Sequence, residues 1–136
     1  SGIDGRAFLI RLTDPDAWFD GREESLQIRI ATTLKLGGGG ISSIEWDPVL
    51  NGFLLASSTE DNTKEFSGSR LWFWQEREGD LREICRFQNR ALEGICRIHK
   101  GPQAGNMLLA FDEETFTADW KPKDGGSVAI LKWGRR

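Results

Sequence analysis

The chain has 136 residues and a mass of 15.3 kDa, with 38% hydrophobic and 29% charged residues. These values predict one globular domain over residues 1–136. No apolar run approaches the roughly 20 residues that span a bilayer. The net charge is −3 and the pI is near 5.2, with charges of both signs scattered along the chain. Membrane and nucleic acid are therefore not the expected partners.

The cysteines and the N-terminal residues bear on the cellular compartment. Cys85 and Cys96 each lie in an apolar strand pattern, without a second Cys or His at metal-binding spacing. We interpret them as reduced core residues, and a bridge between adjacent strands is the alternative. The N-terminal residues do not place a basic region before an apolar core. A cytoplasmic location is therefore favoured, with export left open.

Two strands are predicted before a glycine-rich stretch. Residues 6–13 (RAFLIRLT) form the first, which ends at Asp14-Pro15, a pair that favours a turn. Residues 26–36 alternate between apolar and polar side chains and are expected to pair with it in antiparallel fashion. The connection between these two strands is predicted to be a loop.

Six tryptophans and no tyrosine are unusual in a chain of this size. We interpret most of them as packing residues between sheets, because most lie in predicted strands. Trp18 and Trp120 lie outside the strands and are the candidates for a ligand-binding platform. For Trp18 and the adjacent Phe19, a plug over the end of the sheet is the favoured interpretation.

Four consecutive glycines occupy residues 37–40. Such a run can be a flexible linker, or a place where the backbone passes too close to a neighbour for a Cβ atom. Neither flanking segment is predicted to fold alone, so we favour the close approach.

Residues 40–87 are typical of a four-stranded antiparallel meander. The Asn-Gly pair at 51–52 is a strong hairpin signal. The second and third runs are apolar on both faces, so both strands are expected to be covered on two sides. In the fourth run, Arg82 and Arg86 are expected on the face of Ile84, which predicts a peripheral strand. The four runs are residues 41–46, 53–58, 70–75 and 81–87.

Later segments repeat the pattern of this meander. Residues 91–95, 106–110 and 128–133 can be laid on residues 40–44, 52–56 and 69–74, with offsets of 51, 54 and 59. Four-stranded repeats of about 40 to 50 residues are typical of propeller blades. The chain is therefore predicted to be all-β and antiparallel, a partial β-propeller of about two to two and a half blades. Its parts are a half blade (5–36), a full blade (40–87) and a partial blade (91–133).

A β-sandwich or barrel of about nine strands is the alternative architecture. Too few blades to close a ring would expose apolar faces and unpaired strand edges. The expected partners are therefore another copy of the chain, or N-terminal blades that this sequence does not contain.

The segments GGGGISSI, FLLASS, SRLWFW, ALEGI and MLLAFD resemble the C-terminal part of an uncharacterised bacterial family of β-propellers. The resemblance covers most of residues 5–133. A more distant similarity is to gluconolactonase and esterase-like phytase propellers, in which a Glu-Gly motif opens a blade and its glutamate can bind a metal. Glu93-Gly94 and Asp112 carry this second similarity. The preceding blade has Ser42-Ser43 at the equivalent place, which offers no carboxylate ligand.

Glu93 is the leading functional candidate, because it is an acidic residue in a predicted innermost strand. With Asp112, Glu113 or Glu114 it could bind a hard cation such as Ca²⁺, and the alternative is a hydrogen bond to backbone amides that braces a loop. His99 is the only histidine and is interpreted as a surface or loop residue. The sequence contains no nucleophile elbow, phosphate-binding loop or dinucleotide fingerprint. No catalytic residue is therefore predicted.

Two functions follow from these observations, and whether the chain is an enzyme is left open. The first is a binding or scaffold module without a cofactor, whose loops at residues 59–69 and 99–105 present a surface to a protein or small molecule. The second is a metal-dependent propeller hydrolase that uses Glu93 and Ca²⁺.

Overall fold

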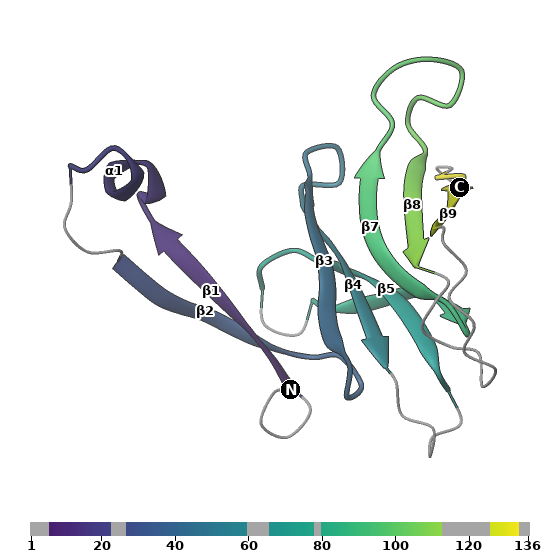
Figure 1. Ribbon diagram of the computed structural model, residues 1–136, viewed down its shortest axis with the longest axis horizontal. Coiled ribbons are helices and arrows are strands. Elements are labelled where there is room, and N and C mark those ends of the chain that lie inside the picture. The colour runs from purple at the N-terminus through teal and green to yellow at the C-terminus, as the bar shows by residue number, and fades with distance from the viewer. Residues whose placement is uncertain (1–5, 23–26, 60–65, 78–79, 113–125, 134–136) are drawn as a thin grey trace. The chain divides into compact units, whose positions relative to one another are not determined.

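The computed structural model describes residues 6–22, 27–59, 66–77, 80–112 and 126–133. It is all-β with antiparallel sheets, and the described residues contain nine strands and one short helix (Figure 1). The chain divides into two compact units, Ser1–Gly38 and Gly39–Arg136. The elements are β1 (Arg6–Thr13), α1 (Pro15–Phe19), β2 (Gln27–Lys35), β3 (Gly40–Asp47), β4 (Gly52–Thr59), β5 (Gly68–Trp74), β6 (Arg82–Gln88), β7 (Ala91–Arg97), β8 (Met107–Asp112) and β9 (Gly126–Leu131).

The first unit is the predicted antiparallel pair, β1 with β2. Its connection contains α1, so the prediction of a plain loop is wrong. Asp14 caps this helix by accepting a hydrogen bond from the amide of Ala17 at 3.1 Å, and Pro15 occupies the first turn. An aspartate cap followed by proline is a helix-start signal as well as a turn signal.

Trp18 and Phe19 lie on α1, and their rings contact each other with centroids 4.9 Å apart. Trp18 is 41% exposed and Phe19 is 75% exposed. The interpretation of these two residues as a plug over the sheet is therefore wrong. A helix of five residues has too short a buried side to hold both aromatic rings, and only Ala17 in it is buried.

The glycine run contains the predicted close approach. A Cβ atom on Gly39 would lie 2.7 Å from the carbonyl oxygen of Ser58 and 2.9 Å from Oγ1 of Thr59. Gly37 and Gly38 have positive φ angles of 68° and 92°, a conformation that glycine adopts without strain. The run is also where the two units meet in sequence.

The second unit begins with a four-stranded sheet in the order β3-β4-β5-β6, as predicted for residues 40–87. Asn51 has φ of 51°, the left-handed conformation that the hairpin signal implies. Strands β4 and β5 are buried along most of their length, so the prediction that both are covered on two sides is confirmed.

Strand β6 is the edge strand and is largely exposed, as predicted. The placement of Arg82 and Arg86 on one face is wrong. A bulge in the β5–β6 pairing puts Arg82 opposite Phe73 and Arg86 opposite Arg70, which are on opposite faces of β5. An extra residue in a strand reverses the alternation that a sequence pattern assumes.

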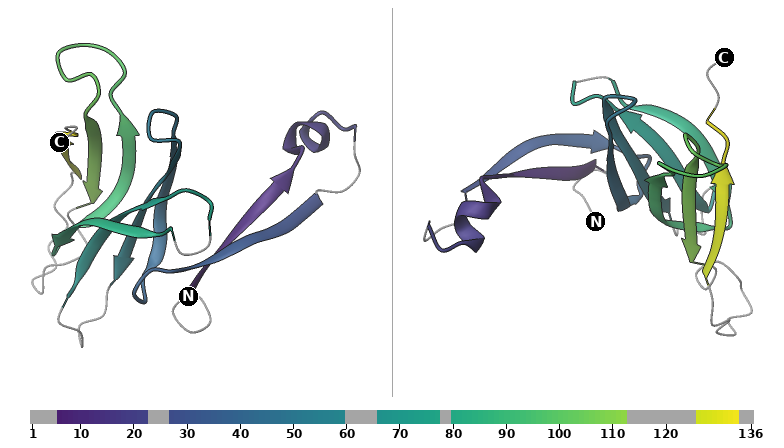
Figure 2. Two further views of the ribbon diagram at one scale, coloured as in Figure 1. Left: turned by 180° about the vertical axis from the view of Figure 1, so that it is seen from behind. Right: turned by 90° about the horizontal axis from the view of Figure 1, so that it is seen from above.

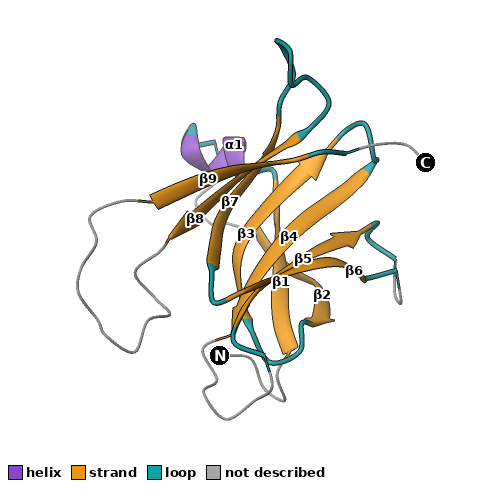
Figure 3. Ribbon diagram, turned by 90° about the vertical axis from the view of Figure 1, so that its right-hand side faces the viewer, coloured by secondary structure: helices purple, strands orange, loops and turns teal. Residues whose placement is uncertain are grey.

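A three-stranded sheet follows in the order β7-β8-β9. Strand β7 contacts β3, β4 and β5, and Figures 2 and 3 show the two sheets as separate layers. The core lies between them. Its buried members are Leu54, Ala56, Leu71 and Phe73 from the four-stranded sheet and Leu92, Ile95, Met107, Leu109 and Phe111 from the three-stranded sheet.

Both cysteines are free, as predicted, and they lie in different sheets. Cys85 is half-buried and packs against the core, whereas Cys96 is exposed, so the interpretation of Cys96 as a core residue is wrong. The β7–β8 register pairs Cys96 with Leu108, on the face that points away from the core. His99 follows β7 in an exposed loop, as predicted.

Candidate functional site

The predicted residue Glu93 lies at a β-bulge. Leu92 pairs with Phe111 and Gly94 pairs with Ala110, so Glu93 has no partner across the β7–β8 ladder. Bulges occur where a sheet redirects a side chain, and Glu93 is exposed here. Asp112 lies at the end of β8, opposite Ala91.

The structure brings Glu93 and Asp112 within electrostatic range of each other. Partial burial, followed by repulsion from the Asp112 carboxylate, raises the pKa of Glu93 above its ordinary value. Two repelling carboxylates attract a cation, but Ca²⁺ takes six to eight oxygen ligands. In the part of the chain that the structure describes, no three His, Cys, Asp or Glu side chains come together. Glu113 and Glu114, the further carboxylates expected beside Asp112, lie outside the described residues.

The start of β7 is held to the four-stranded sheet by serine hydroxyls. Ser42 donates to the carbonyl of Leu92 at 2.5 Å. The amide of Leu92 donates to Oγ of Ser69 at 2.7 Å, and Ser69 donates to the carbonyl of Arg90 at 2.8 Å. Ser42 therefore braces the strand that carries Glu93. The sequence identified Ser42 only as a position without a carboxylate, because a bond between residues 50 positions apart leaves no local signal.

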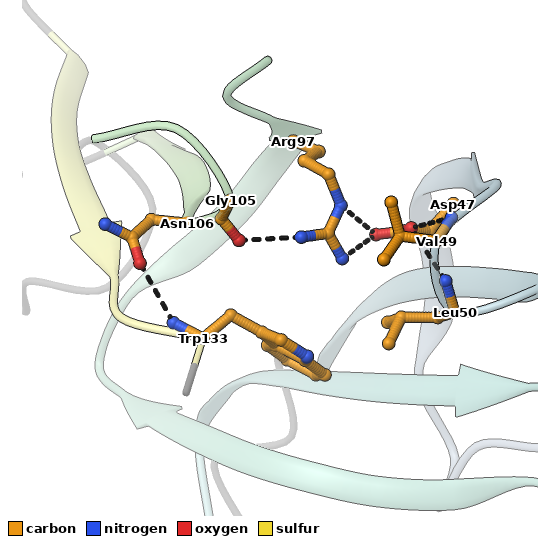
Figure 4. A network of polar contacts seen from close by, with 7 residues as sticks. All are labelled: Asp47, Val49, Leu50, Arg97, Gly105, Asn106 and Trp133. Atoms are coloured by element: carbon orange, nitrogen blue, oxygen red, sulfur yellow. Dashed lines mark hydrogen bonds and ion pairs between the residues drawn. The ribbon is translucent and has the colours of Figure 1, made fainter. Parts of the chain in front are cut away.

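A second connection between the sheets is a buried ion pair that the sequence did not identify (Figure 4). The side chain of Asp47 is 1% exposed and that of Arg97 is 8% exposed. Nη2 and Nε of Arg97 lie 2.5 Å and 2.8 Å from Oδ2 of Asp47. Arg97 also donates to the carbonyl of Gly105 at 2.6 Å. Oδ1 of Asp47 accepts from the amides of Val49 and Leu50 at 2.9 Å and 3.1 Å.

These contacts determine the ionisation of Asp47. Burial by itself would raise the pKa of this carboxyl. Hydrogen bonds from Arg97 and from the amides of Leu50 and Val49, together with the charge of Arg97, outweigh burial and hold the pKa below its ordinary value. Asp47 is therefore a buried carboxylate that links the end of β3 to the end of β7 through Arg97.

The three-stranded sheet has an apolar face that points away from the core. We call it the open face, and its residues are Leu108, Ala110, Val128 and Ile130. Val128 is 71% exposed and Ile130 is 46% exposed. In the ladder, Val128 pairs with Ala110 and Ile130 pairs with Leu108, so the four side chains lie together. Large contiguous apolar patches are typical of contact sites, so this face is a candidate for one.

The tryptophan prediction has a mixed outcome. Trp72 and Trp74 are buried, and Trp72 donates through Nε1 to Oγ of Ser57 at 2.9 Å, in agreement with a packing role. Trp18 is exposed, so it is available to a ligand. Trp120, the other candidate for a binding platform, lies outside the described residues.

Comparisons with known proteins add no relative. The chain matches no protein-family model, no curated protein and no solved structure. Within the described residues, no helix has the length and apolar character to cross a membrane.

Proposed function

We propose that the chain is a binding or scaffold module of the β-propeller type. Its open face stacks on another sheet of the same kind, supplied by a second copy of the chain or by the blades of a larger propeller. The observation that carries the proposal is that the open face is exposed, whereas the corresponding face of the four-stranded sheet is buried.

The correspondence between the two sheets rests on their registers. The β3–β4 ladder skips Ser42, between Ile41 and Ser43, and the β7–β8 ladder skips Glu93. The two bulges are 51 positions apart (93 − 42), which is the offset predicted for the first strands. Ala56 and Ala110 are the ladder partners of the residues directly after the two bulges. They are 54 positions apart (110 − 56), which is the predicted offset for the second strands.

The third strands correspond with an offset different from the one predicted. Ala56 pairs with Leu71 and Ala110 pairs with Val128, so the registers give 57 (128 − 71) and not 59. With this correction, Leu54, Ala56, Leu71 and Phe73 correspond to Leu108, Ala110, Val128 and Ile130, the residues of the open face.

Burial differs between these corresponding sets. Leu54, Ala56 and Leu71 are fully buried and Phe73 is 7% exposed, because the three-stranded sheet covers them. The open face has apolar side chains at the same register positions, and a further sheet packed against it would bury them in the same way. Burial of two such side chains would contribute about 1.5 to 3 kcal/mol each towards association.

A charge on the open face tests the proposal. We expect the chain to self-associate as its concentration rises in sedimentation or light-scattering measurements, and Val128→Lys to prevent this. Val49→Lys is the control, because Val49 is 64% exposed but lies in the β3–β4 turn, outside the open face. A chain that stays monomeric at every concentration rules out the second copy as partner. Equal effects of the two substitutions would refute the open face as the contact.

The hydrolase is the second candidate, favoured by the repulsion between Glu93 and Asp112. Bound Ca²⁺ would relieve this repulsion and stabilise the fold. Thermal unfolding with CaCl₂ and with EDTA separates the two functions. A rise in melting temperature with Ca²⁺ that Glu93→Gln abolishes would support the hydrolase, whereas an unchanged melting temperature would rule out the metal site.

A further inference from the structure

A cavity of about 290 Å³ lies away from both the open face and Glu93. Its lining residues are Leu50, Phe73, Arg82, Glu83, Ile84 and Trp133. Leu50, Ile84 and Trp133 pack against the core while staying partly exposed, and Phe73 belongs to the core itself. The walls are therefore apolar and partly aromatic. The volume is just below the range typical of small-molecule sites, so only a small ligand fits.

Arg82 supplies a positive charge beside these apolar walls. The bulge in the β5–β6 pairing puts Arg82 opposite Phe73, and its guanidinium carbon lies 5.3 Å from the centre of the Phe73 ring. Within the described residues, Arg82 has no ion-pair or hydrogen-bond partner. Stacking on a ring leaves the N–H groups at the edge of the guanidinium free to bind a planar anion.

The carboxylate of Glu83 does not cancel this charge. Glu83 pairs with Trp72 across the ladder, and so its side chain lies on the face of β6 opposite to that of Arg82. There Nε and Nη2 of Arg86 contact it at 2.5 Å and 3.2 Å, and Nε of Arg70 lies 3.7 Å away. Two guanidinium groups thus neutralise Glu83. The cavity retains the positive charge of Arg82.

Two of the walls are held by hydrogen bonds that lie near the buried ion pair (Figure 4). The amide of Leu50 donates to Asp47 at 3.1 Å, and the amide of Trp133 donates to Oδ1 of Asn106 at 3.2 Å. These bonds hold the two backbone segments in place before any ligand arrives. A cavity with walls set in advance loses less entropy on binding than one that must be ordered.

We propose that this cavity binds a small aromatic carboxylate. The ring lies among Leu50, Ile84 and Trp133, and the carboxylate accepts two N–H bonds from Arg82. Guanidinium and carboxylate match in this paired geometry, and aromatic rings pack favourably against tryptophan. This site is independent of the proposed sheet stacking, since none of its lining residues belongs to the open face.

Phenylacetate and its uncharged analogue phenylacetamide are suitable probes. Titration of the ¹⁵N-labelled protein, followed by the indole N–H resonance of Trp133, measures binding at the cavity itself. The assignment is checked with Trp133→Phe. We expect saturable binding of phenylacetate, with an affinity in about the millimolar range for so small a ligand. Phenylacetamide should bind about tenfold more weakly, because it has no charge for Arg82 to contact.

Arg82→Gln should weaken phenylacetate binding by about tenfold and leave phenylacetamide binding nearly unchanged. Arg90→Gln is the matched control, because the Arg90 guanidinium also stacks on a ring, 5.0 Å from the centre of Phe111, but does not line the cavity. Equal affinities for the two probes, or an Arg82→Gln variant that binds phenylacetate as the wild type does, would overturn the proposal. Failure of phenylacetate to shift the Trp133 resonance would overturn it as well.

Discussion

Removal of the Arg97 guanidinium should be among the most damaging single substitutions in the second unit. Arg97→Met keeps much of the apolar stem but leaves Asp47 ionised, 1% exposed and without its charged partner. Breaking a buried pair from one side typically costs about 3 to 5 kcal/mol. Asp47 keeps its bonds to the amides of Val49 and Leu50, which places the expected loss near the lower value, about 3 kcal/mol.

This loss is large enough to measure directly. For a unit of the length of residues 39–136, a loss of 1 kcal/mol lowers the melting temperature by about 4–8 °C. Arg97→Met should therefore lower the melting temperature by about 12–24 °C. Urea unfolding followed by tryptophan fluorescence and circular dichroism gives the free energy. Arg86→Gln is the control, because the Arg86–Glu83 pair is 55% and 28% exposed and should contribute little to stability.

A double-mutant cycle and a pH series isolate the pair. Asp47→Asn with Arg97→Met should be less harmful than the sum of the two single substitutions. The pKa of Asp47 is lowered in the folded state. Its contribution is therefore present above the ordinary carboxyl pKa of about 3.9 and disappears as the pH falls through the lowered value. Asp47→Asn should remove this acid-dependent loss. A coupling energy near zero, with no change in the pH profile, would refute the role of the pair.

Three further substitutions test local contacts. Gly39→Ala should destabilise the second unit by about 1–3 kcal/mol, because its Cβ would lie 2.7 Å from a backbone oxygen. The neighbouring Gly40→Ala is the control, because its Cβ would meet nothing within 4 Å and the change should be nearly neutral. Similar urea midpoints for the two variants would contradict this prediction. Ser69→Ala should cost about 1–3 kcal/mol by leaving the buried amide of Leu92 unpaired, measured by the same unfolding assay. The raised pKa of Glu93 means that its charged form is disfavoured in the folded state, so wild-type stability falls as the pH rises through its titration. Glu93→Gln should therefore stabilise the fold near pH 7 and have no effect at about pH 3, where the glutamate is uncharged. An effect independent of pH would show that repulsion from Asp112 is not its cause.

The strands themselves were predictable from local pattern. Period-two alternation, the Asn51-Gly52 turn and the two-sided apolar runs depend only on neighbouring residues, and all four strands of the meander are present. The helix at Pro15 was missed because its start signal is the same residue pair that favours a turn.

The candidate sites were less predictable, because they depend on bulges and on distant pairs. A single bulge in the β5–β6 ladder places Arg82 beside Phe73 and separates it from Arg86. Alternation in the sequence could not reveal that extra residue. The Asp47–Arg97 pair joins positions 50 residues apart, and both residues look like ordinary surface charges in the sequence.

Composition, turn signals and alternation by themselves determined that this chain is all-β and where its strands run. These properties are local, since a strand is encoded by residues next to one another. Only the tertiary structure decided which faces are covered. It buries Leu71 beneath the second sheet, leaves Val128 exposed, and turns Arg82 towards an apolar cavity. Burial depends on what packs against a face, and a strand's own sequence does not contain that information.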